Sequence, residues 1–158
     1  MIAELKRTEQ GYSACFERHF KQPVARVWAM LTENGKLQQW FPELKVEELR
    51  TGGIITFDMQ DGSFKTMEIV EMLPESVLEY TWSADLVRFE LSPEDGGGCR
   101  LVLIEKLTQL TEHTPRDLAG WDVCLDVIGA LLDGREFGPR HPVWAKRYEE
   151  YKQRIDAL

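Results

Sequence analysis

The chain has 158 residues, 43% of them apolar, a formal net charge of −8 and a sequence pI near 5.0. A chain of this length is expected to form one domain that buries roughly 68–70% of the surface of its unfolded state, so it needs neither disulfides nor a metal for stability. The acidic balance argues against DNA, RNA or an anionic membrane as partner, because each is bound by a cationic face. The alternative interpretation is that the charge only keeps the protein soluble.

The cysteines Cys15, Cys99 and Cys124 are widely spaced and form no CxxC pair. Reduced thiols in a cytoplasmic setting fit this usage best. No apolar run approaches the ~18 residues that a membrane span needs. Residues 1–7 lack the apolar core of a signal peptide. We therefore expect a cytoplasmic protein without membrane insertion.

The first elements are a strand and two short helices. Residues 12–20 alternate in polarity and predict a strand. Pro23 suits the first position of a helix, because its missing N–H would be unpaired there. That helix carries one apolar stripe and is expected to stop at Asn34-Gly35. A second short helix is predicted over residues 37–41.

From residue 44 to residue 106 the pattern is that of strands and tight turns. Turn signals stand at Gly52-Gly53, Asp61-Gly62 and two further sites. Strands joined by short turns form an antiparallel meander. The sequence predicts six strands here, over residues 44–49, 54–59, 64–73, 77–82, 86–91 and 99–106.

The apolar period then changes from two to 3.6. A long amphipathic helix is predicted from about Pro115 to Leu132, with Trp121 on its apolar side and Asp122 and Asp126 on the other. A last helix is predicted from about residue 142, with an apolar stripe that covers either the domain itself or a partner or second copy. A sheet with one apolar face must bury it, and only the helix around Trp121 is long and apolar enough.

Five short runs resemble one family in their order: residues 23–41, which include Trp40-Phe41, then Gly52-Gly53, residues 74–82, residues 98–103, and Gly120-Trp121. Over about residues 11–134 the chain resembles the activator of heat-shock-protein-90 ATPase homologue-like (AHSA-type) branch of the START/SRPBCC superfamily. The resemblance implies one α+β domain, residues 1–158, with a helix-grip fold: a curved seven-stranded antiparallel sheet around a long C-terminal helix. Residues 139–158 would be a helical extension.

The resemblance also implies a function. Many superfamily members bind apolar ligands between sheet and helix, and a minority are enzymes. No catalytic residue is universal in the family. The last strand often carries a histidine where this chain has Glu105, which puts any chemistry based on that histidine in doubt.

A curved sheet and a straight helix differ in shape, so the gap between them is either filled by large side chains or used for a ligand. The predicted inner faces are rich in aromatic residues, which either line such a cavity or fill the core. The two short helices would lie at its mouth, where Trp40 and Phe41 could form a lid. The ligand-binding candidates are Phe16, Arg18, Phe20, Trp40, Phe41, Phe57, Tyr80, Trp82, Phe89, Leu101, Leu103, Glu105, Trp121, Leu125 and Ile128.

Arg18 and Glu105 are the polar members of this set. In the helix-grip order the first and last strands are neighbours, so the two could face each other inside. A buried pair of this kind is weak support for stability and better support for a polar handle on a ligand. Alternatively, either residue lies near a strand end and reaches solvent.

No catalytic constellation, cofactor motif or metal site is found. His19 is expected to point outward, His113 and His141 fall in loops, and no HxxxH spacing occurs. The favoured hypothesis is a binding protein for an apolar or amphipathic, lipid- or polyketide-like molecule. The alternatives are a protein-interaction module of the chaperone-ATPase-activator type and an enzyme that uses a polar group such as Glu105 in the cavity.

Overall fold

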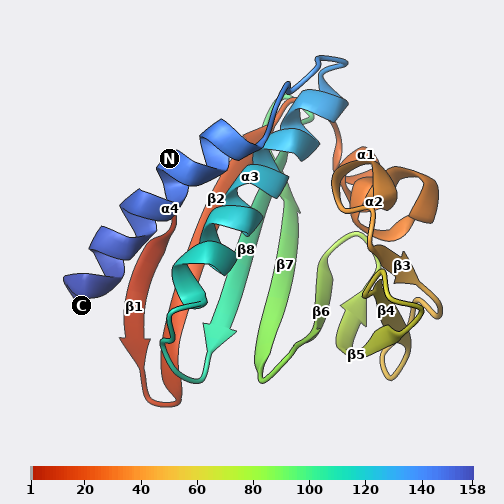
Figure 1. The fold of residues 1–158 in the computed structure, drawn as a ribbon. Helices are drawn as coiled ribbons and strands as arrows, with labels where there is room; N and C mark the ends of the chain where they lie inside the picture. The colour runs from red at the N-terminus through yellow and green to blue at the C-terminus, as the bar shows by residue number, and fades with distance from the viewer. Residues whose placement is uncertain (1) are drawn as a thin grey trace.

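The computed structural model describes residues 2–158 (Figure 1). In this part of the chain one antiparallel sheet of eight strands has the order β1-β2-β8-β7-β6-β5-β4-β3. The strands are β1 Glu4–Thr8, β2 Gly11–Phe20, β3 Leu44–Val46, β4 Ile54–Asp58, β5 Phe64–Leu73, β6 Val77–Trp82, β7 Asp85–Pro93 and β8 Cys99–Leu107. The helices are α1 Val24–Thr32, α2 Asn34–Trp40, α3 Thr114–Leu132 and α4 His141–Asp156.

The helices gather on one face and one end of the sheet. In Figure 1, α3 crosses the strands β2, β8 and β7, while α1 and α2 lie at the opposite side near β3. The helix α4 runs beside α3 and reaches over β1. The apolar side chains of the inner sheet face and of α3 form one core, which includes Phe16, Leu103 and Leu125, each 0% exposed. This is the helix-grip arrangement that the family resemblance implies, with the long helix that the period change predicts.

The number of strands is a correction, because the sequence analysis predicts seven. The missed strand is β1, which pairs with β2 from Glu4 opposite Cys15 to Thr8 opposite Gly11. It is an edge strand whose residues are mostly exposed, so it carries no apolar alternation to detect. Gly11 permits the tight hairpin: its φ is +144°, and a Cβ there would lie 2.3 Å from the carbonyl oxygen of Leu107.

The Asn34-Gly35 pair is a second correction. It does not end a helix but begins α2, because Glu33 is extended and separates α1 from α2. The Asn34 side chain accepts a hydrogen bond from the Val46 N–H at 2.8 Å and donates one to the Val46 carbonyl at 3.0 Å. A long-range contact with β3 therefore decides the role of this pair, which the local pattern could not show.

The helix α4 covers its own domain. Tyr151 on α4 is completely buried, and Trp144, Tyr148 and Ile155 are partly buried against the core. Because α4 and the N-terminal segment lie over α3, Asp122 is 0% exposed. The expectation that Asp122 lies on the solvent side of its helix is therefore wrong. None of the helices in residues 2–158 combines the length and apolar character needed to cross a membrane.

Candidate functional site

Aromatic side chains from the sheet, α2 and α3 form one connected cluster. Each ring centroid lies within 6.4 Å of another, and the shortest separation, 5.0 Å, joins Trp82 and Trp121. Most pairs are tilted or edge-on, the geometry that aromatic quadrupoles favour. All members were ligand-binding candidates from the sequence: Trp40, Phe41, Phe57, Tyr80, Trp82, Phe89 and Trp121.

One side of this cluster is hollowed into an open groove of about 650 Å³, which we call the aromatic groove. This volume is in the range of small-molecule sites. A smaller hollow of about 190 Å³ adjoins it and shares Phe57, Trp82, His113 and Asp117 with it. The groove is lined by the rings Trp40, Phe41, Phe57, Trp82, Trp121 and Trp144 and by polar residues that include Glu43, Arg116, Asp117, Arg140 and His141.

The other candidates lie elsewhere. Tyr80 and Phe89 belong to the aromatic cluster but are buried beneath the groove, and burial raises the pKa of the Tyr80 hydroxyl. Phe20 is half-buried and packs against Gly129 of α3. The remaining apolar candidates are core residues, each 0% exposed: Phe16, Leu101, Leu103, Leu125 and Ile128.

Arg18 and Glu105 do not meet. Both lie on the inner face, but the strand register places Arg18 opposite Leu101 and Glu105 opposite Ala14. Neither is exposed: the Arg18 side chain is 14% accessible and Glu105 is 0% exposed. The two polar candidates therefore belong to separate sites.

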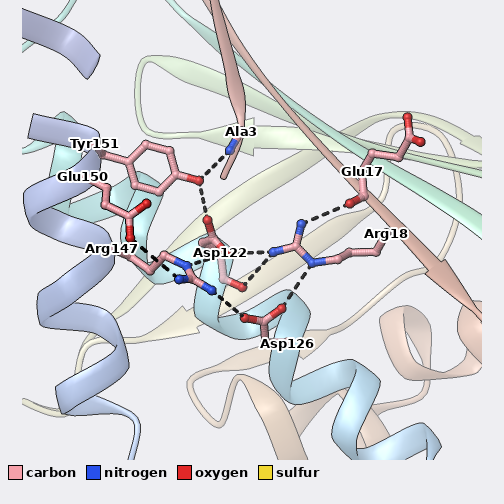
Figure 2. A network of polar contacts seen from close by, with 8 residues as sticks. All are labelled: Ala3, Glu17, Arg18, Asp122, Asp126, Arg147, Glu150 and Tyr151. Atoms are coloured by element: carbon pink, nitrogen blue, oxygen red, sulfur yellow. Dashed lines mark hydrogen bonds and ion pairs between the residues drawn. The ribbon is translucent and has the colours of Figure 1, made fainter. Parts of the chain in front are cut away.

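Arg18 belongs to a charge network that joins β2, α3 and α4 (Figure 2). Its guanidinium donates to Asp122 at 2.7 Å and to Asp126 at 3.2 Å. From the other side, Arg147 of α4 reaches the same carboxylates at 3.4 and 3.5 Å. The Tyr151 hydroxyl donates to Asp122 and accepts the backbone N–H of Ala3 at 2.8 Å.

Asp122 is the centre of this network. Burial raises its pKa, while the Tyr151 hydrogen bond and the Arg18 and Arg147 charges oppose that rise. A buried carboxylate that is fully paired in this way holds elements in register. The network therefore fastens α4 and the N-terminal segment to α3, and none of its charged residues lines the aromatic groove.

Glu105 forms a different buried contact. Within residues 2–158, neither of its carboxyl oxygens accepts a hydrogen bond. The group that it meets is the side chain of Asp117, in the first turn of α3. Two carboxyl groups share a hydrogen bond only if one of them carries a proton.

Glu105 is the more buried member of this pair. Burial raises its pKa well above the usual range, and the neighbouring Asp117 carboxyl raises it further. Asp117 Oδ1 accepts the Trp82 indole N–H at 3.1 Å. Asp117 is partly exposed and lines the groove, so this acid pair joins the groove to the protein interior.

Three further side chains shape the groove. Trp121 is 2% exposed and its indole N–H has no acceptor in the described structure. Arg140, just before α4, donates to the Trp40 carbonyl at 2.9 Å and to the Gln39 carbonyl at 3.5 Å. The Trp144 indole N–H donates to the Arg116 carbonyl at 3.3 Å. These bonds fix the beginning of α4 at the rim of the groove.

Several lining residues were missed by the sequence analysis. Asp117 was not singled out, although it precedes Trp121 by one helical turn and so shares its face. Arg116 lies in the first turn of α3 beside Asp117, whereas Arg140 and Trp144 are brought to the groove by the packing of α4, for which the local sequence holds no signal. His19 is exposed, as expected, and contacts Glu17 and Glu94 at 2.8 Å each. Within residues 2–158 no cluster of side chains could hold a metal ion.

The fold and the site define an α+β protein of the helix-grip type, with an aromatic groove between the sheet, α2 and α3. A model of the family described as activator of Hsp90 ATPase homolog 1-like protein (AHSA1) matches residues 21–133. The chain therefore belongs to the AHSA1-like family of the SRPBCC superfamily. No curated protein gives a significant match.

Solved structures share the fold. The conserved protein of unknown function EF2215 from Enterococcus faecalis is 25% identical, with a TM-score of 0.89 over 99% of this chain and 91% of that one. CalU16 from Micromonospora echinospora is 23% identical, with a TM-score of 0.73 over 96% of this chain and 94% of that one. DynU16, from the dynemicin biosynthetic locus, is 20% identical, with a TM-score of 0.66 over 78% of this chain and 48% of that one.

Proposed function

We propose that this protein binds a small apolar or amphipathic molecule that contains a ring system, and that the aromatic groove is the site. The observation that carries the proposal is the set of ring side chains along an open hollow of about 650 Å³. Such sites combine mostly apolar walls with a few placed polar groups. Asp117, Arg116 and Arg140 are polar residues of this lining.

The proposal differs in place from the cavity that the sequence suggests. The inner core residues around Phe16 and Leu125 are tightly buried, whereas the groove opens beside Phe57 and Trp82. The location of DynU16 in the dynemicin biosynthetic locus is consistent with a small-molecule ligand for this fold. A lipid- or polyketide-like identity is part of this proposal.

The test has two parts. Mass spectrometry of the organic extract of protein purified from its native host should give one enriched small molecule at near-stoichiometric amount. A thermal-shift panel of fatty acids, flavonoids and polyketides should contain stabilising compounds. An empty extract together with no shift in the panel would refute the proposal.

A pair of phenylalanine variants tests whether the aromatic groove is the binding site. Phe57 lines the groove, whereas Phe64, on the adjacent strand, is 65% exposed and lies outside it. Phe57→Ala should weaken binding of any stabilising compound by tenfold or more, while Phe64→Ala should change it by less than twofold. Equal losses in the two variants would place binding elsewhere.

A second function is favoured by one observation. Exposed apolar side chains lie on β5 and in the turn between β4 and β5, including Met59 and Phe64, which are 45% and 65% exposed. Exposed apolar patches mark protein-interaction sites. We infer that, if the chain regulates a chaperone ATPase, this surface makes the contact. Stimulation of Hsp90 ATPase activity that Phe64→Asp abolishes and Phe57→Ala retains would support this function, and the absence of stimulation would refute it.

A further inference from the structure

Glu105 and Asp117, the acid pair at the aromatic groove, have no cationic partner among the residues that the structure describes. Glu105 is completely buried and Asp117 is partly exposed, yet neither forms an ion pair with a lysine, arginine or histidine of residues 2–158. Buried carboxyl groups are normally accompanied by a positive charge or by several donors. Asp122 on the same helix shows the usual arrangement, with Arg18 and Arg147 both in contact.

A cation that is bound in the groove could pair with Asp117. Asp117 lines the aromatic groove and two adjoining hollows, each of about 190 Å³. Trp82 lines the groove beside it and donates its indole N–H to the carboxylate, which holds the side chain in place. The rings of Phe57 and Trp121 complete the surrounding wall.

The two arginines of the groove do not fill this role. Arg140 donates to the carbonyl oxygens of Trp40 and Gln39. The Arg116 guanidinium lies over the ring of Tyr148, 5.7 Å from its centroid. Both cations are thus turned toward other partners, and neither forms an ion pair with Asp117.

We propose that the aromatic groove binds an organic cation, a molecule that joins an ammonium-type nitrogen to an apolar ring, with Asp117 as its counter-charge. The rings contribute because cations are attracted to the faces of tryptophan and phenylalanine. The net charge of −8 favours the approach of a cation over that of an anion. This inference rests on the proposed function, because it assigns a ligand class to the same groove.

Three probes with the same phenylethyl group and polar ends of different charge test the inference. The probes are 2-phenylethylammonium, 2-phenylethanol and 3-phenylpropanoate, each titrated near neutral pH into the ¹⁵N-labelled protein. The readout is the set of tryptophan indole N–H signals, because Trp40, Trp82 and Trp121 line the groove. We expect the ammonium probe to bind at least tenfold more tightly than the alcohol, and the carboxylate to bind most weakly.

Two isosteric variants form a matched pair. Asp117→Asn keeps an oxygen for the Trp82 N–H but removes the charge, so it should lower affinity for the ammonium probe to that for the alcohol. Asp95→Asn removes an exposed carboxylate in the turn between β7 and β8, outside the groove, and should change the affinity by less than twofold. Thermal unfolding of each variant establishes that it is folded.

The outcomes separate the two proposals. A cation preference that Asp117→Asn removes supports the inference. If the alcohol binds as well as the ammonium, if the carboxylate binds best, or if Asp117→Asn retains the cation preference, the inference is wrong while the groove remains a ligand site. If no probe of any charge moves the groove signals and the ligand panel also fails, both proposals are wrong.

Discussion

The hydroxyl of Tyr151 on α4 donates a hydrogen bond to the buried carboxylate of Asp122 on α3. The same hydroxyl accepts the backbone N–H of Ala3, so one side chain joins the N-terminal segment, α3 and α4 (Figure 2). This contact attaches α4 to the domain, and the first turns of α4 in turn supply the Trp144 wall of the aromatic groove.

Tyr151→Phe should therefore lower the free energy of unfolding by about 1.5–3 kcal/mol, the range for hydrogen bonds to charged groups. The variant keeps the ring, removes one of the donors to Asp122 and leaves the Ala3 N–H without its acceptor. The measurement is urea unfolding, with the midpoint and slope compared between variants. Tyr148→Phe, on the same helix, is the control, because the Tyr148 hydroxyl makes no hydrogen bond within residues 2–158. Similar losses in both variants would contradict the role assigned to the Asp122 contact.

Phenylalanines of the core and of the groove should respond differently to truncation. Phe16 is 0% exposed, so Phe16→Ala should cost about 3–5 kcal/mol, the usual range for a buried phenylalanine. Phe57 is half-buried, so Phe57→Ala should cost clearly less while weakening ligand binding. Urea unfolding and the ligand panel give the two readouts. An equal stability loss in both variants would mean that Phe57 is a core residue.

Glu105 should make stability depend on pH. Its folded-state pKa is raised above the ordinary 4.5 by burial and by the Asp117 and Asp85 carboxyls, so its contribution to stability is complete below about pH 4.5. This contribution is lost as pH rises through the folded-state pKa. Glu105→Gln imitates the protonated acid and should remove this dependence.

The expected gain of Glu105→Gln over the wild type is roughly 1–3 kcal/mol at alkaline pH, the cost of an unsatisfied buried polar group. At pH 4.5 the two proteins should be nearly equal in stability. Urea unfolding at intervals between pH 4.5 and pH 9 measures the difference. Parallel stability curves for the two proteins would show that Glu105 does not titrate in this range.

The three thiols should react at different rates. Burial raises the pKa of Cys99 to about 11 and that of Cys124 to about 12, which leaves little thiolate near neutral pH. Cys15 is the one of the three that is partly exposed, and its pKa is also raised, first by burial. Mass spectrometry after brief alkylation should find Cys15 modified first. Cys124 lines the groove and should become slower still when a ligand is bound. Fast modification of Cys124 in the free protein would contradict its buried placement.

Much of the fold could be predicted because its signals are local. The alternation over residues 64–73 and 77–82 matches the strands β5 and β6 residue for residue. The 3.6-residue period around Trp121 locates α3 to within one residue at its start. The edge strand β1 escaped prediction because an exposed polar strand has no apolar alternation, and its stability comes from pairing with β2.

The candidate site, like the fold, could be predicted only where its signals are local. The aromatic candidates follow from strand and helix parity, and seven of them form one cluster in the structure. Parity alone could not separate Phe57, which borders the groove, from Phe16, which is sealed in the core. Strand parity also could not predict that Arg18 forms ion pairs with Asp122 and Asp126, or that Glu105 lies next to Asp117.

The sequence by itself determined most of the elements, their apolar faces and the family, because these depend on residue periodicity and on short runs in a defined order. The tertiary structure alone decided which polar groups are buried and what they contact. The register of β2 with β8 separates Arg18 from Glu105, and the docking of α4 buries Asp122 and builds the rim of the aromatic groove. Such contacts join residues far apart in the chain, and their energies depend on burial and geometry that no local pattern records.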